Sequence, residues 1–105
     1  MSVSDRYREI ARDVQSMQRM IQGEGEAAEP AAKSVGQAVE DLAELLEGVG
    51  DIPRNRLESQ LTPVLLKAHG RLDRARLLLD EQGAEDRAAA VWELEQKIYR
   101  LLNDL

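Results

Sequence analysis

Cysteine and phenylalanine are both absent from this 105-residue chain, and aromatic residues of all kinds make up only 3% of it. Without cysteine there can be no disulfide framework, no thiol nucleophile and no cysteine-based metal site. A core without phenylalanine must use small aliphatic side chains, which suit helix–helix packing better than a sheet sandwich. No segment approaches the roughly 20 apolar residues that cross a bilayer, and the first residues lack the apolar stretch of a secretory signal. We therefore expect a cytoplasmic protein with no membrane association.

Charged and helix-forming residues are plentiful. Hydrophobic residues make up 43% of the chain and charged residues 32%, and alanine, leucine, glutamate, arginine and glutamine all favour helix. The length suits one domain with one core. The net charge of −6 disfavours a nucleic-acid partner, because duplex binding normally needs a concentrated positive surface. The sequence predicts one all-α domain over residues 1–105.

Apolar residues recur at intervals of three and four in four segments, which predicts helices at about 4–22, 31–48, 54–82 and 84–104. Ser4 is the expected N-cap of the first helix. Its apolar stripe consists of Val3, Tyr7, Ile10, Val14, Met17 and Ile21. The short connection between the second and third helices predicts an antiparallel hairpin.

Residues 23–30 contain two glycines and several glutamates, and they predict a flexible acidic linker within the domain. Pro30 could begin the second helix, since the first helical turn tolerates proline. The leading fold is an antiparallel four-helix bundle with coiled-coil-like stripes. The alternative is a three-helix bundle from which the first helix is detached or swapped into another chain.

Pro63 lies inside the third predicted helix, where a proline costs roughly 3 kcal/mol and removes a backbone hydrogen bond. Thr62 followed by Pro63 also resembles an N-cap with a first-turn proline, so a break at 61–62 is an alternative. The apolar stripe from Leu57 to Leu79 keeps its phase across this point. We therefore expect one continuous helix with a kink near Pro63.

The fourth predicted helix has more apolar surface than one neighbour would cover. Trp92 and Tyr99 are seven residues apart and share a face, and Leu102 widens it. Such a helix packs on two sides. Either both sides meet its own bundle, or one side is an oligomer or partner interface with Trp92 and Tyr99 as anchors.

The third helix has a similar surplus. Leu66, Gly70 and Leu77 fall near one line, and a glycine there would let another helix approach closely. Gly70 could equally be a tolerated defect. We take Trp92, Tyr99, Leu102, Leu66 and Leu77 as the candidate partner-binding residues.

Charges also form stripes. One side of the third helix is basic, with a candidate anion-binding set of Lys67, Arg71, Arg74 and Arg76. In a hairpin that turns near residue 52, the segment from Lys67 to Arg74 is expected to extend past the start of the second helix, toward the acidic linker. We interpret this stripe mainly as an internal electrostatic match, with a phosphate or nucleic-acid site as the alternative.

Reaction chemistry is hard to assemble from these residues. The one histidine, His69, lies four residues before Asp73 on one face, but no nucleophile accompanies them. A di-iron bundle site needs Glu-x-x-His pairs, and the residue three before His69 is Leu66. We expect no catalytic residues, no cofactor and no metal.

The leading hypothesis is a non-enzymatic protein-interaction module (an adaptor, regulator or dedicated chaperone) that acts through apolar helical surfaces. It is expected to bind another protein or itself, for example as a homodimer. The alternatives are a nucleic-acid or anion binder through the basic stripe, and a minimal metal-binding or enzymatic bundle.

Overall fold

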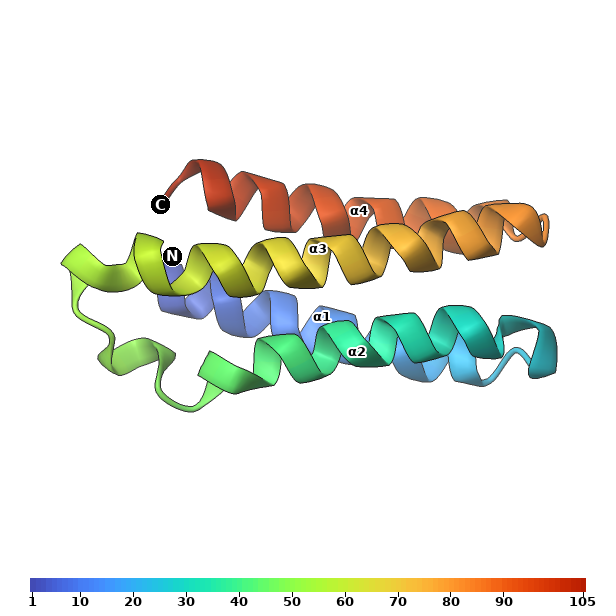
Figure 1. The fold of residues 1–105 in the computed structure, drawn as a ribbon, viewed down its shortest axis with the longest axis horizontal. Coiled ribbons are helices and arrows are strands. Elements are labelled where there is room, and N and C mark those ends of the chain that lie inside the picture. Colours follow the sequence, from blue (N-terminus) through green and yellow to red (C-terminus); the bar gives the residue numbers. More distant parts are fainter.

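The apolar stripes of the sequence become four helices: α1 (Val3–Gln22), α2 (Glu29–Leu46), α3 (Leu57–Glu81) and α4 (Glu85–Asn103). They form an antiparallel four-helix bundle in a computed structural model that describes residues 1–105 (Figure 1). The bundle is elongated, with extents of 43 × 22 × 21 Å. The predicted four-helix fold is therefore confirmed. None of these helices is both long enough and apolar enough to cross a membrane.

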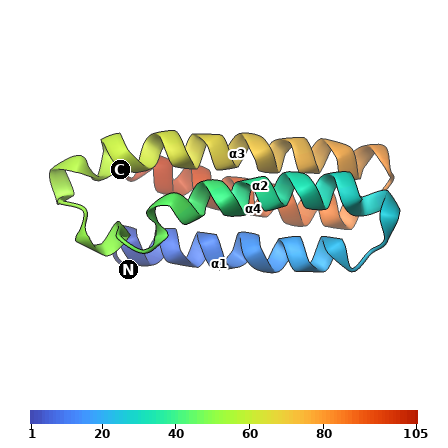
Figure 2. The same cartoon turned by 60° about the horizontal axis from the view of Figure 1, so that its bottom comes forward.

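Each helix packs against its neighbours in the sequence, and α1 closes the bundle against α4. Both chain termini lie at the end of the bundle where α2 connects to α3, while the α1–α2 and α3–α4 connections lie at the opposite end (Figures 1 and 2). The three-helix alternative with a detached first helix is wrong, because the apolar stripe of α1 is buried in the core from Tyr7 to Ile21.

The core is one continuous cluster of 24 buried apolar residues drawn from all four helices. Polar bonds fix the register of the helix pairs at two points. The Tyr7 hydroxyl of α1 donates to the carbonyl oxygen of Leu42 in α2. The Ser34 hydroxyl of α2 donates to the carbonyl oxygen of Arg71 in α3 over 2.7 Å. A buried hydroxyl must find such a partner, so each bond favours one alignment of its two helices.

The predicted N-cap of the first helix is wrong by two residues. Ser2, not Ser4, caps α1, and its side-chain oxygen accepts the Asp5 backbone N–H over 3.1 Å. This start adds Val3 to the helix, where it packs against the core, and places the Asp5 carboxylate in the positively polarised first turn. The second helix also ends two residues earlier than predicted, at Leu46.

The predicted acidic linker is shorter and more structured than expected. Residues Glu26–Ala28 form a 3₁₀ turn that runs directly into α2. Two side-chain contacts tie this connection to the neighbouring α3–α4 turn: Glu24 pairs with Arg87, and the Gln82 amide donates to the carbonyl oxygen of Ala27. The first two helices are thus joined by a connection that packs against the rest of the bundle.

Helix α3 runs without interruption through Pro63, so the continuous helix is confirmed and the alternative break at 61–62 is wrong. Leu61 and Leu65, on either side of the proline, are both fully buried. The proline itself is exposed. Packing on the buried side therefore offsets the lost backbone hydrogen bond.

Candidate functional site

Most of the large apolar side chains that remain exposed lie on α3 and α4. Each of them is between 46% and 57% exposed: Leu66 and Leu77 of α3, and Trp92 and Tyr99 of α4. The chain has only three other exposed large apolar side chains, which are dispersed: Met1, Met20 and Leu46. We call the surface formed by Leu66, Leu77, Trp92 and Tyr99 the α3–α4 face.

Helix geometry explains why the two exposed side chains of each helix point to the same side of that helix. On α3, Leu65 and Leu72 point into the core, and Leu66 is rotated from Leu65 by about 100°. Leu77 follows Leu66 after three helical turns and so points the same way. On α4, Trp92 and Tyr99 are two turns apart and lie on one side.

A buried carboxylate lies beneath this face. Glu95 of α4 is completely buried, and neither of its side-chain oxygens has a hydrogen-bond partner. Two basic side chains of α3 approach it instead. Arg76 Nε lies 3.5 Å from Oε2, and His69 Nε2 lies 3.7 Å from Oε1. Such a carboxyl is costly to ionise, because its partners compensate only part of the lost hydration.

Arg76 connects this buried carboxyl to the surface. Its guanidinium lies over the Trp92 ring, 5.6 Å from the ring centroid, where a cation–π attraction acts. Its Nη2 donates to Asp73 over 2.8 Å, and its Nη1 lies 3.4 Å from Asp80. One side chain thus orders Trp92 and shields Glu95. We call His69, Asp73, Arg76 and Glu95 the Glu95 cluster.

The two carboxyls of the cluster titrate in opposite directions. The pKa of Glu95 is raised to about 7, first by burial and then by the neighbouring Asp73 carboxylate, while Arg76 opposes the rise. The hydrogen bond from Arg76 lowers the pKa of Asp73. Near neutral pH, Glu95 therefore exchanges a proton while Asp73 stays ionised, so the charge of the cluster depends on pH.

The structure places the five predicted partner-binding residues in two groups. Trp92, Tyr99, Leu66 and Leu77 form the exposed face. Leu102 is only partly exposed and packs against the core, so it borders the face.

The predicted basic stripe does not form one surface. Arg71 pairs with Asp41 of α2 at 3.2 Å, whereas Arg76 points toward α4. Lys67 and Arg74 are exposed. The expectation that Lys67 to Arg74 extends past the start of α2 is wrong, because the bond from Ser34 to Arg71 places this segment alongside α2.

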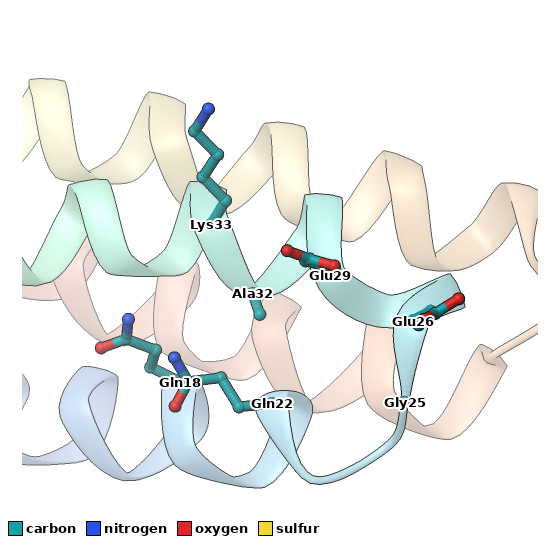
Figure 3. A pocket seen from close by; sticks show the side chains of 7 residues that line it. All are labelled: Gln18, Gln22, Gly25, Glu26, Glu29, Ala32 and Lys33. Carbon is teal, nitrogen blue, oxygen red and sulfur yellow. The ribbon is translucent and has the colours of Figure 1, made fainter.

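Several hollows lie on other sides of the bundle, two of them lined by residues of α2. One, of about 370 Å³, lies between α2 and α3 and includes Arg71 and Arg74 in its lining. The other, of about 480 Å³, opens between α1 and the start of α2 (Figure 3). Its lining comprises Gln18, Gln22, Gly25, Glu26, Glu29, Ala32 and Lys33. Only one of these is hydrophobic, which differs from the mostly apolar lining of small-molecule sites.

The sequence-based prediction did not include Glu95, although its spacing from neighbouring apolar residues indicates that it is buried. Glu95 follows Val91 by four residues and precedes Ile98 by three, which is the spacing of the apolar stripe itself. A carboxylate in that phase lies at the edge of the core. Its position could have indicated a partly buried acid facing the basic residues of the third helix.

Comparison with protein-family models, with characterised proteins and with solved structures finds no match to this chain. The functional argument therefore depends on the α3–α4 face and the Glu95 cluster. No three histidine, aspartate or glutamate side chains are grouped so that they could hold a metal ion.

Proposed function

We propose that this protein is a non-enzymatic protein-interaction module, acting as an adaptor, regulator or dedicated chaperone, and that the α3–α4 face is its binding surface. The observation that carries the proposal is that four of the seven exposed large apolar side chains lie on two helices that pack against each other, α3 and α4. Monomeric proteins rarely leave apolar groups clustered in this way unless the surface binds something.

The chemistry of the face supports binding to protein. Tryptophan and tyrosine concentrate binding energy in protein interfaces, because they bury a large rigid area and keep a polar group available. Trp92 is already ordered by Arg76, whose side chain bonds to Asp73. A partner therefore meets a ring whose position costs little entropy to fix.

The burial of Glu95 supports the non-enzymatic part of the proposal. A general acid or base must come within hydrogen-bond distance of its substrate. Glu95 has no exposed surface, and Arg76 and His69 occupy its surroundings.

Affinity capture from the native extract tests the proposal. We expect the double variant Trp92→Ala/Tyr99→Ala to lose proteins that the unchanged chain retains, since truncating an interface anchor costs about 2 kcal/mol or more, over tenfold in affinity. The matched control is Leu46→Ala, because Leu46 is an exposed leucine of α2 outside the face. Equal capture by all three proteins would show that the α3–α4 face is not the binding surface.

A further inference from the structure

The hydrogen-bond donors of the cation nearest to Glu95 are directed to other carboxylates. Arg76 donates to one oxygen of Asp73, from Nε over 3.1 Å and from Nη2 over 2.8 Å. Its Nη1 donates to Asp80 over 3.4 Å. Both of these carboxylates are partly exposed, whereas the Glu95 side chain has no exposed surface. The guanidinium therefore bonds to the two carboxylates that water also reaches, and the one that water does not reach has no donor.

This distribution of hydrogen bonds is the one expected for a neutral Glu95. A buried carboxylate without donors is strongly unfavourable, whereas a neutral carboxyl group has an O–H donor of its own. Asp73 is close enough to accept a hydrogen bond from that group. A proton on Glu95 thus supplies the donor that two ionised carboxylates lack, and Arg76 can remain with Asp73 and Asp80.

We infer that the Glu95 cluster is a proton-dependent switch that controls the position of Arg76 over the Trp92 ring. With a proton on Glu95, Arg76 stays bonded to Asp73 and lies over the ring, as in the structure. When Glu95 releases the proton to solvent, its carboxylate repels that of Asp73. It then attracts Arg76 and His69, and the guanidinium turns away from the ring. The inference gives the regulation of the α3–α4 face, and in that respect it rests on the proposed function.

The movements that the switch requires are small. Arg76 Nε lies 3.5 Å from Glu95 Oε2, and His69 Nε2 lies 3.7 Å from Oε1. A shift of about 1 Å brings either nitrogen to the length of a charge-assisted hydrogen bond. The place of the guanidinium over Trp92 is set by its present bonds to carboxylates of α3. A turn toward Glu95 alters that place without any movement of the helices.

The groups around Glu95 place the switch near neutral pH. The titratable side chains that face Glu95 come from α3: His69, Asp73 and Arg76. Helix α1 also packs against α4, but its Glu9 and Asp13 bond to Lys97 instead. Burial raises the pKa of Glu95 to about 7. The closed arrangement, with the cation over the ring, is therefore the form below neutral pH.

Quenching of Trp92 fluorescence by acrylamide between pH 5 and pH 9 tests the switch. Trp92 is the only tryptophan in the chain, and acrylamide is uncharged, so the charge of the cluster does not steer it. The quenching constant should rise with a midpoint near pH 7, because the ring loses its cover when Arg76 turns away. At high pH it should approach the value of Arg76→Ala, which should be high at every pH.

Glu95→Gln is the decisive variant. Its side chain has nearly the same shape, stays neutral at every pH and has an amide donor for Asp73. Its quenching constant should remain at the low-pH value throughout. Lys97→Met is the matched control, because Lys97 is an ionisable residue of α4 that faces α1, and it should keep the rise. Circular dichroism at each pH checks that every protein stays folded.

His69→Gln separates Glu95 from the other group of the cluster that can titrate near neutral pH. The rise in quenching should persist in His69→Gln, because Arg76 is still attracted to ionised Glu95. A rise that is lost in His69→Gln but kept in Glu95→Gln would overturn the inference, since the imidazole would then control the ring. A quenching constant of the unchanged chain that does not depend on pH would also overturn it.

The quenching measurement needs no partner, so a failure of the switch is separate from a failure of the proposed function. A constant that ignores pH overturns the switch even where affinity capture depends on Trp92 and Tyr99. A rise that Glu95→Gln abolishes supports the switch even where Trp92→Ala/Tyr99→Ala captures the same proteins as the unchanged chain. That second result would overturn the proposed function alone.

Discussion

Helix α4 packs against α1 on one side and against α3 on the other, and we call these two contacts the α1 seam and the α3 seam. The two seams differ in how their charged side chains are stabilised. Toward α1, Lys97 lies at the edge of the bundle with its amine 2.7 Å from Glu9 and 2.6 Å from Asp13. Toward α3, the Glu95 carboxylate is fully buried with no hydrogen-bond partner. Both seams bring an ionisable side chain of α4 close to side chains of the opposite type, acidic or basic, on a neighbouring helix. Only Lys97 makes hydrogen bonds to those neighbours.

The difference shows in the two pKa values. Burial alone would lower the pKa of Lys97, but hydrogen bonds to Asp13 and Glu9 outweigh burial and raise it. Burial dominates at Glu95 and raises its pKa to about 7. The α1 seam thus favours the charged form of its residue, and the α3 seam favours the neutral form. The α3 seam is also the one beneath the apolar face.

The largest expected effect comes from Glu95→Gln. The pKa of Glu95 rises from 4.5 in its ordinary state to about 7 in the fold, so between these values the folded chain holds a proton that the unfolded chain has lost. Stability therefore falls as pH rises through this window. At about 1.4 kcal/mol per pKa unit, ionised Glu95 costs up to about 3 kcal/mol at pH 8.

Urea unfolding of both proteins at pH 5 and pH 8 measures this effect. Relative to the unchanged chain, Glu95→Gln should be more stable at pH 8 and nearly equal at pH 5. A stability difference that is the same at both pH values would show that the burial of Glu95 does not govern its ionisation.

A smaller effect, in this case a loss of stability, is expected from Arg76→Met, which keeps a long side chain but removes its charge. Glu95 then loses its nearest cation and Trp92 its cation–π partner. Removing one member of a buried ion pair costs about 3–5 kcal/mol, but Glu95 can take up a proton instead, so we expect about 2 kcal/mol at pH 8. Chemical unfolding measures the change, and in a Glu95→Gln background the loss should shrink.

The smallest effect is expected from Lys97→Met on the α1 seam. Its ion pairs with Glu9 and Asp13 lie at the partly exposed edge of the bundle, where such pairs contribute under about 1 kcal/mol. The loss measured by urea unfolding should diminish further in high salt. A loss as large as that of Arg76→Met would mean that the two seams of α4 do not differ as described.

The helices and their core faces could be predicted from the sequence, because apolar spacing alone determines them. All but one residue of the predicted first stripe are buried, the exception being Val3 at the helix start. The phase of Leu61 and Leu65 likewise predicted a continuous α3 across Pro63. Local cap chemistry was less predictable, since Ser2 and Ser4 are equivalent by residue type and only the backbone geometry selects Ser2.

The apolar members of the site could also be predicted, whereas its polar centre could not. Trp92 and Tyr99 were recognisable from their seven-residue spacing. The partners of Glu95 depend on the alignment of α3 with α4, which brings residues 69 and 76 to the same carboxylate. That alignment is a property of packing between helices, and the periodicity of one helix does not contain it.

The fluorescence of Trp92 tests the central claim most directly, because it is the only tryptophan in the chain. The ring is 46% exposed, and a protein partner bound at the α3–α4 face would cover it. The emission should shift to shorter wavelength when a protein captured by the unchanged chain is added back, and Leu77→Glu should show a smaller shift. An emission maximum that does not change on addition of a captured protein would contradict the α3–α4 face as the binding surface.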